Sequence, residues 1–156
     1  MILNNYNEAI AHIKGGKDFP QIDGIVTLKE EKDGVLVTAK IKGLPQAQNH
    51  CKGRFFGFHI HEGSSCTGNQ DDEFADAGMH YNPTKCAHPF HVGDLPPLLE
   101  NNGYAYMSVL VNKFKIRDIL GRVIIIHDMP DDFTTQPSGN SGKKIACGKI
   151  TNLNHF

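Results

Sequence analysis

Two histidines, one residue apart near the end of an apolar stretch, are the side chains of this sequence best suited to chemistry. The stretch reads Phe55-Phe56-Gly57-Phe58-His59-Ile60-His61-Glu62. Because side chains alternate between the two faces of a β-strand, His59 and His61 fall on one face and the apolar residues around them on the other. Imidazole is the commonest metal ligand and suits zinc, copper, iron and nickel. The pair alone is a weak signal, since such pairs also occur as ordinary hydrogen-bonded histidines.

The other histidines strengthen the case for a metal. The nine histidines of the chain are His12, His50, His59, His61, His80, His88, His91, His127 and His155. The segment from His80 to Asp94 contains three of them and a carboxylate, and its Pro and Gly content indicates a loop. Three imidazoles and one carboxylate suit a tetrahedral Zn²⁺ site. A solvated polar loop is the alternative, and the coincidence with the His59–His61 pair and with His127 at the end of another apolar run disfavours it.

These residues lie in motifs that resemble those of the copper,zinc superoxide dismutases. The matching segments are Gly57–Glu62, Ala77–Pro83, His91–Leu95, Val123–His127 and Gly139–Gly148. The resemblance runs from residue 9 to residue 150, and the segment Asp131–Gly139 is similar to bacterial members of the family. The motifs are long and occur in the family's order, so the match is far more specific than any single pattern.

The resemblance implies two metal sites that share one ligand. The implied copper ligands are His59, His61, His80 and His127. The implied zinc ligands are His80, His88, His91 and Asp94, so His80 bridges the metals as an imidazolate. Asp131 matches a carboxylate that hydrogen-bonds one ligand from each site, whereas Asp132 is expected to be a solvated residue of an acidic turn.

The implied activity is dismutation of superoxide to O₂ and H₂O₂. Zn²⁺ does not change oxidation state, so copper carries the electrons and zinc is structural. His80 is implied to be catalytic, because its bond to copper breaks on reduction and it then takes up a proton that it later delivers. The second implied catalytic residue is Lys144, where the family has an arginine that guides the anion. Lysine keeps the charge but lacks the bidentate fork of arginine, so we expect attraction with poorer positioning, and we expect Lys143 to be a solvated charge.

The chain has four cysteines. The resemblance implies a disulfide between Cys66 and Cys147. Cys51 and Cys86 have no counterpart in the family. Cys86 lies inside the implied zinc loop, where a thiolate could compete for the metal, but we expect an unpaired thiol.

The elements that would position these side chains are β-strands. Strand-like runs cover residues 9–13, 25–28, 35–42, 55–61, 104–111, 123–127 and 144–150. Residues 33–34 and 101–103 carry turn signals, and residues 114–120 suit one short helix or turn. This pattern predicts an all-β fold, a Greek-key β-barrel or immunoglobulin-like sandwich, as does the resemblance. The connections 62–103 and 128–143 are long enough to be functional loops.

Bulk properties limit the partners. We expect one domain over residues 9–156 of the 156-residue chain, after an N-terminal extension of residues 1–8. The formal net charge of −1 predicts no nucleic-acid partner. No apolar run approaches the ~18 residues of a membrane span, and the first residues do not read as a secretory signal, so the sequence predicts a cytoplasmic protein. The resemblance allows a homodimer without indicating its interface.

The sequence leaves two other functions open. A dismutase-like module could store or deliver copper without turnover, although the complete copper ligand set disfavours it. A zinc hydrolase could use the loop from His80 to Asp94, but four protein ligands leave no open position for water. His12, His50 and His155 are expected to be surface histidines.

Overall fold

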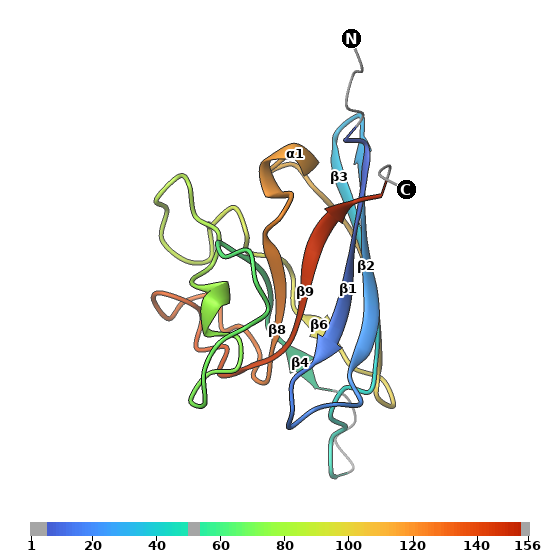
Figure 1. Ribbon diagram of the computed structural model, residues 1–156, viewed down its shortest axis with the longest axis vertical. Helices are drawn as coiled ribbons and strands as arrows, with labels where there is room; N and C mark the ends of the chain where they lie inside the picture. Colours follow the sequence, from blue (N-terminus) through green and yellow to red (C-terminus); the bar gives the residue numbers. More distant parts are fainter. Residues whose placement is uncertain (1–5, 50–53, 154–156) are drawn as a thin grey trace.

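A curled antiparallel sheet forms most of the computed structural model, which describes residues 6–49 and 54–153 (Figure 1). The strands are β1 (Glu8–Gly15), β2 (Asp23–Glu31), β3 (Gly34–Lys42), β4 (Phe55–Phe56), β5 (Phe58–His61), β6 (Leu98–Leu99), β7 (Tyr104–Val111), β8 (Val123–His127) and β9 (Lys144–Asn152). Between them lie the 3₁₀ helix η1 (Ala75–Ala77) and the helix α1 (Ile116–Ile119). Every strand expected from the sequence is present, and the predicted short helix is α1.

Seven strands form one sheet in the order β5-β8-β9-β1-β2-β3-β7, and β4 pairs with β6. The last strand, β9, returns to lie beside β1, next to the meander β1-β2-β3, which is the Greek-key arrangement. The chain passes from β4 directly into the edge strand β5, while β6 contacts the opposite edge strand, β7. The β4-β6 ribbon therefore connects the two edges of the sheet, and the predicted Greek-key barrel is confirmed.

The predicted strand over residues 55–61 is interrupted at Gly57. A Cβ atom at this position would lie 2.9 Å from the Cβ of Ser141 and 3.2 Å from the Cβ of His127. The Gly57 N–H donates to Met129 O and its carbonyl accepts from the His127 N–H, each at 2.8 Å. The absence of a side chain thus lets the segment after β8 approach β5 closely. The sequence did not indicate β6 or η1, both inside the long connection 62–103.

The strand β8 is buried on both faces. Ile124 and Ile126 belong to the barrel core, together with Phe58 and Ile60 of β5. Val123 and Ile125, on the opposite face of β8, pack in a second cluster with Phe74, Ala77, Cys147 and Cys66.

His59, His61 and His127 lie on this outer side of the sheet, as strand alternation predicts for the first two. The loops 62–97 and 128–143 lie outside the barrel on this side (Figure 1). Within the described residues, no helix has the length and apolar character needed to cross a bilayer.

Candidate metal centre

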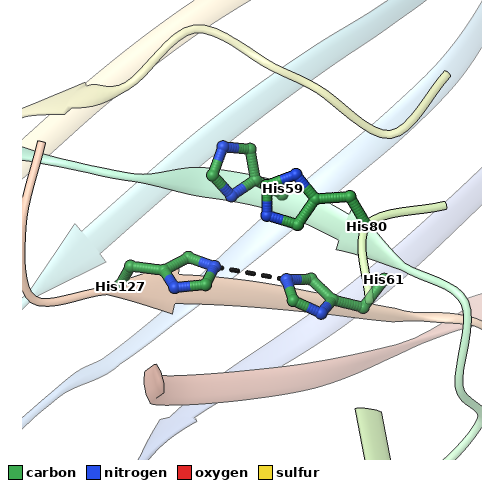
Figure 2. A group of neighbouring side chains, drawn as sticks. All are labelled: His59, His61, His80 and His127. Carbon is green, nitrogen blue, oxygen red and sulfur yellow. Dashed lines mark hydrogen bonds between the residues drawn. The ribbon is translucent and has the colours of Figure 1, made fainter. Parts of the chain in front are cut away.

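Four histidines from three elements converge on the outer side of β5 and β8. His59 and His61 come from β5, His127 ends β8, and His80 comes from the loop after β5 (Figure 2). One ring nitrogen from each lies within 4.8 Å of the other three, and all four side chains are buried. The loop is attached to β5 by backbone pairing, because His80 forms an isolated bridge with His61 and Asp94 forms one with His59. This backbone pairing holds His80 and Asp94 beside β5.

The ring orientations leave an unmatched pair of nitrogens at the centre. The His61 Nδ1–H donates to the Gly78 carbonyl at 2.8 Å, and the His127 Nδ1–H donates to the Gly142 carbonyl at 3.4 Å. Their two Nε2 atoms then face each other across 3.2 Å (Figure 2). In neutral imidazoles with Nδ1 protonated, both Nε2 atoms carry lone pairs, so neither can donate to the other. A cation between them removes this conflict.

A second group shares His80 with the first. Single ligand atoms of His80, His88, His91 and Asp94 also lie within 4.8 Å of one another. The His80 Nδ1 is 2.8 Å from Asp94 Oδ1, and the Nδ1 atoms of His88 and His91 are 3.1 and 3.3 Å from Asp94 Oδ2. Three imidazoles and one carboxylate match the ligand preference of Zn²⁺.

Four buried imidazole nitrogens make no hydrogen bond of acceptable geometry to the described residues, although two of them, on His88 and His91, lie near Asp94 Oδ2. They are His59 Nδ1, His80 Nε2, His88 Nδ1 and His91 Nδ1. Unsatisfied buried polar atoms are costly and rare in folded proteins. All four belong to the two groups, and a bound cation would satisfy their lone pairs. The residues present therefore fit two metal ions, one in each group.

Asp131 connects the two groups from outside. Its Oδ2 accepts from His59 Nε2 at 2.7 Å, and its Oδ1 accepts from His88 Nε2 at 2.8 Å. The backbone N–H of Phe133 donates to the same carboxylate at 2.8 Å. Because these bonds place a proton on Nε2 of both rings, the lone pairs are on the Nδ1 atoms, which are the unpartnered ones. Asp132, by contrast, accepts from Thr134 and Thr135 in an exposed turn, as expected.

The electrostatics favour neutral imidazoles and ionised carboxylates. Burial lowers the pKa of His59 to about 4 and that of His127 to about 3, and it holds the pKa of His61 well below its ordinary value. Burial alone would raise the pKa of Asp131, but the hydrogen bonds from His59 and His88 outweigh it and lower this pKa. Metal ligands must be deprotonated to bind, so both shifts suit the groups to metal binding.

A cavity of about 440 Å³ opens onto the first group. His61, His80, His127 and Lys144 line it, so the position expected for the guiding charge does lie at the site. The sequence did not indicate that the Lys144 ammonium forms an ion pair with Asp72, 72 residues earlier in the chain. The only available signal was that Asp72 belongs to a short acidic run in a long loop. Lys143 also lines the cavity and is exposed.

A disulfide between Cys66 and Cys147 ties the first long loop to β9. Cys86 is a free, exposed thiol, as expected. Cys51, His50 and His155 lie outside the described residues, whereas His12 is exposed on β1 as expected.

Comparison of the whole chain with known proteins identifies its family. The family model described as "Copper/zinc superoxide dismutase (SODC)" matches residues 22–150. Cu-Zn superoxide dismutase 2 of Aquifex aeolicus (strain VF5) is 32% identical over 145 residues, covering 83% of this chain and 80% of that protein. The Cu-Zn superoxide dismutase of Photobacterium leiognathi is 32% identical over 141 residues, covering 81% and 78%. The solved structure of Cu/Zn superoxide dismutase from Brucella abortus matches with a TM-score of 0.77 at 26% identity, over 91% of this chain and 98% of that one. Fold, histidine groups and sequence together show that the chain belongs to the copper/zinc superoxide dismutase family and is a superoxide dismutase with copper and zinc as its cofactors.

Proposed function

We propose that the chain converts superoxide to molecular oxygen and hydrogen peroxide at the first histidine group, with the second group as a structural zinc site. The copper ligands in this proposal are His59, His61, His80 and His127. The zinc ligands are His80, His88, His91 and Asp94. When bound, copper supplies the one-electron redox chemistry that the reaction needs. The observation that carries the assignment is the set of unpartnered ring nitrogens, which divides between the two groups.

The protein residues prepare the site in three ways. Asp131 sets the tautomers of His59 and His88 and so couples the geometry of one group to that of the other. His80 lines the cavity, and its Nε2 atom makes no hydrogen bond to the described residues. This nitrogen can hold a proton and donate it to the peroxide that forms when superoxide is reduced. Lys144 places a positive charge on the cavity wall, which favours entry of a small anion.

The second candidate is a module that stores or delivers copper without turnover. The complete ligand set and the open cavity beside it support an enzyme instead, because a storage site has no need of a path for substrate. A zinc hydrolase is disfavoured, since Asp94 and three histidines would fill a tetrahedral zinc.

We also propose that the chain works in an oxidising compartment. Disulfides are rare in cytosolic proteins because thiols there are kept reduced. The Cys66–Cys147 bond therefore favours an oxidising compartment over the cytoplasm expected from the sequence.

The test combines elemental analysis with a superoxide assay on one reconstituted sample. We expect one copper and one zinc per chain, together with turnover, because two complete ligand groups are present. His127→Ala should lose copper-dependent activity and keep zinc. The matched control is His12→Ala, an exposed histidine on β1, which should keep both. Copper bound without turnover would favour the storage module, and loss of zinc with retained copper in His127→Ala would overturn the division of ligands.

A further inference from the structure

The ion pair between Lys144 and Asp72 lies on the wall of the cavity that leads to the copper ligands. Lys144 is the first residue of β9, and Asp72 belongs to the loop after β5. Both line the cavity together with His61, His80 and His127. The side chain of Lys144 is only 17% exposed and that of Asp72 39%, so the pair is partly shielded from water. Salt screens partly buried pairs less than exposed ones.

Asp72 is held in place by its own loop. The Phe74 N–H donates to Asp72 Oδ1 at 3.0 Å, which leaves Oδ2 for the Lys144 ammonium. The Asp72 N–H donates to the Asn69 side-chain oxygen at 3.0 Å. Phe74 is buried in the outer cluster, beside the disulfide that joins this loop to β9. The carboxylate is therefore a fixed partner of Lys144.

The remaining charges do not make the cavity strongly cationic. Besides the pair, the charged residues that line it are Lys17, Lys143, Asp18, Asp71 and Glu73. Glu73 accepts the backbone N–H of Lys17, at 2.8 and 3.1 Å. Three lysines thus face four carboxylates, and the attraction of an anion depends on how far Lys144 is neutralised.

We propose that Asp72 is a positioning residue that limits the attraction of Lys144 for superoxide, so that the anion must compete with the Asp72 carboxylate for the ammonium group. This inference rests on the proposed function of the site. Asp72 holds the ammonium at the cavity wall and at the same time cancels most of its field. The substrate-guiding strength of the site is then set by the pair and not by Lys144 alone.

The first test compares two variants with the same charge change in the same loop. Asp72→Asn keeps an oxygen that can accept the Phe74 N–H but loses the charge that pairs with Lys144. With the copper- and zinc-loaded enzyme at low salt, we expect Asp72→Asn to raise kcat/KM by about three- to tenfold, near the low end of electrostatic steering, and to steepen its salt dependence. Asp71→Asn should change kcat/KM by less than about twofold. It removes one negative charge from the cavity wall but leaves the ion pair between Asp72 and Lys144 intact, and we expect the loss of that pair to have the larger effect. Equal effects of the two substitutions would overturn the proposal.

The second test is a double-mutant cycle with Lys144→Met. If Asp72 acts through Lys144, Asp72→Asn should lose its gain in the Lys144→Met background. A gain of the same size in that background would mean that Asp72 acts on the anion by its own charge, and would contradict the proposal. Asp72→Glu keeps the negative charge, so its kcat/KM should lie near that of the parent and below that of Asp72→Asn.

A third measurement does not depend on turnover. Azide is a small anion with the same charge as superoxide, and its binding can be followed through the absorption of the copper-loaded protein. We expect the azide dissociation constant to fall by a similar factor in Asp72→Asn and to stay near the parent value in Asp71→Asn. If the parent lacks dismutase activity, the proposed function fails, while the azide titration still tests the role of Asp72. An unchanged azide affinity in Asp72→Asn would refute that role.

Discussion

The carboxylate of Asp131 accepts a hydrogen bond from His59 Nε2 at 2.7 Å while its other oxygen is bound to the second histidine group. We predict that Asp131→Asn weakens binding of both metals by about ten- to a hundredfold, the usual effect of losing an outer partner of metal ligands. The two histidines donate to different carboxylate oxygens, and an amide has an NH2 donor in place of one of them, so one of the two hydrogen bonds is lost. Competition titrations with chelators measure both affinities. The control is Asp132→Asn, in the adjacent exposed turn, which should leave them unchanged, and weakening of one metal only would contradict a coupling role.

Breaking the Cys66–Cys147 bond should lower the free energy of unfolding. For a sequence separation of 81 residues, the chain-entropy model gives about 4 kcal/mol. Urea unfolding of the double variant Cys66→Ser, Cys147→Ser, compared with the parent at matched metal content, measures the difference. Cys86→Ser removes a free, exposed thiol and serves as the control, with an expected change near zero. A loss as large in Cys86→Ser would point to a role for that thiol that the structure does not explain.

The metal-free protein should lose stability as the pH falls below about 6.5. Burial lowers the pKa of His59 to about 4 and of His127 to about 3 in the folded state, against an ordinary value of 6.5. Between these values the unfolded chain binds more protons than the folded one, so protonation favours unfolding. Each histidine contributes up to about 1.4 kcal/mol per pH unit.

Urea unfolding of chelator-treated protein from pH 7.5 down to 4.5 measures this slope. His127→Gln should make it shallower. The lowered pKa values of Asp94 and Asp131 act in the same direction at more acidic pH, because their stabilising ionised forms are lost there. A stability that stays flat between pH 6.5 and 4.5 would contradict the buried, neutral state of these rings.

Substitutions at Lys144 should separate charge from geometry. Lys144→Glu places a negative charge beside Asp72, and we expect it to lower kcat/KM by about tenfold or more, on the scale of steering effects. Lys144→Arg should keep or raise activity, because a guanidinium can bind Asp72 and still present further N–H groups to an anion. Stopped-flow rates across a salt series check both, with attraction falling as salt rises. A parental rate for Lys144→Glu at low salt would exclude a guiding role.

The barrel and the faces of β5 could be predicted because strand alternation is a local property. Apolar residues and histidines alternate along β5 with a period of two. The structure places Phe58 and Ile60 in the barrel core and the two histidines on the opposite face, as that period requires. The two-sided burial of β8 could not be predicted from Val123–His127, since a continuous apolar run does not say what covers its outer face. That cover is Phe74 and Ala77, from a loop without periodicity.

The interactions that the sequence did not indicate are those between distant loops. Asp72 and Lys144 are far apart in the chain, and neither has a local signal for pairing. The break at Gly57 depends in the same way on Ser141, which the fold brings close from another loop. Long-range loop contacts of this kind follow from the completed fold, whereas strands follow from short patterns.

Because β8 has apolar side chains on both faces, it separates the barrel core from the outer cluster. The barrel core contains no histidine of either group, whereas the outer cluster includes residues of the loop that carries three of the six, His80, His88 and His91. We therefore expect metal removal to loosen one layer of the molecule and not the other. In the metal-free protein, backbone amides of β1, β2 and β3 should exchange with deuterium slowly, and those of loops 62–97 and 128–143 quickly. The barrel should therefore stay folded without metal, whereas the loops around the metal centre should need the bound ions to become fully ordered.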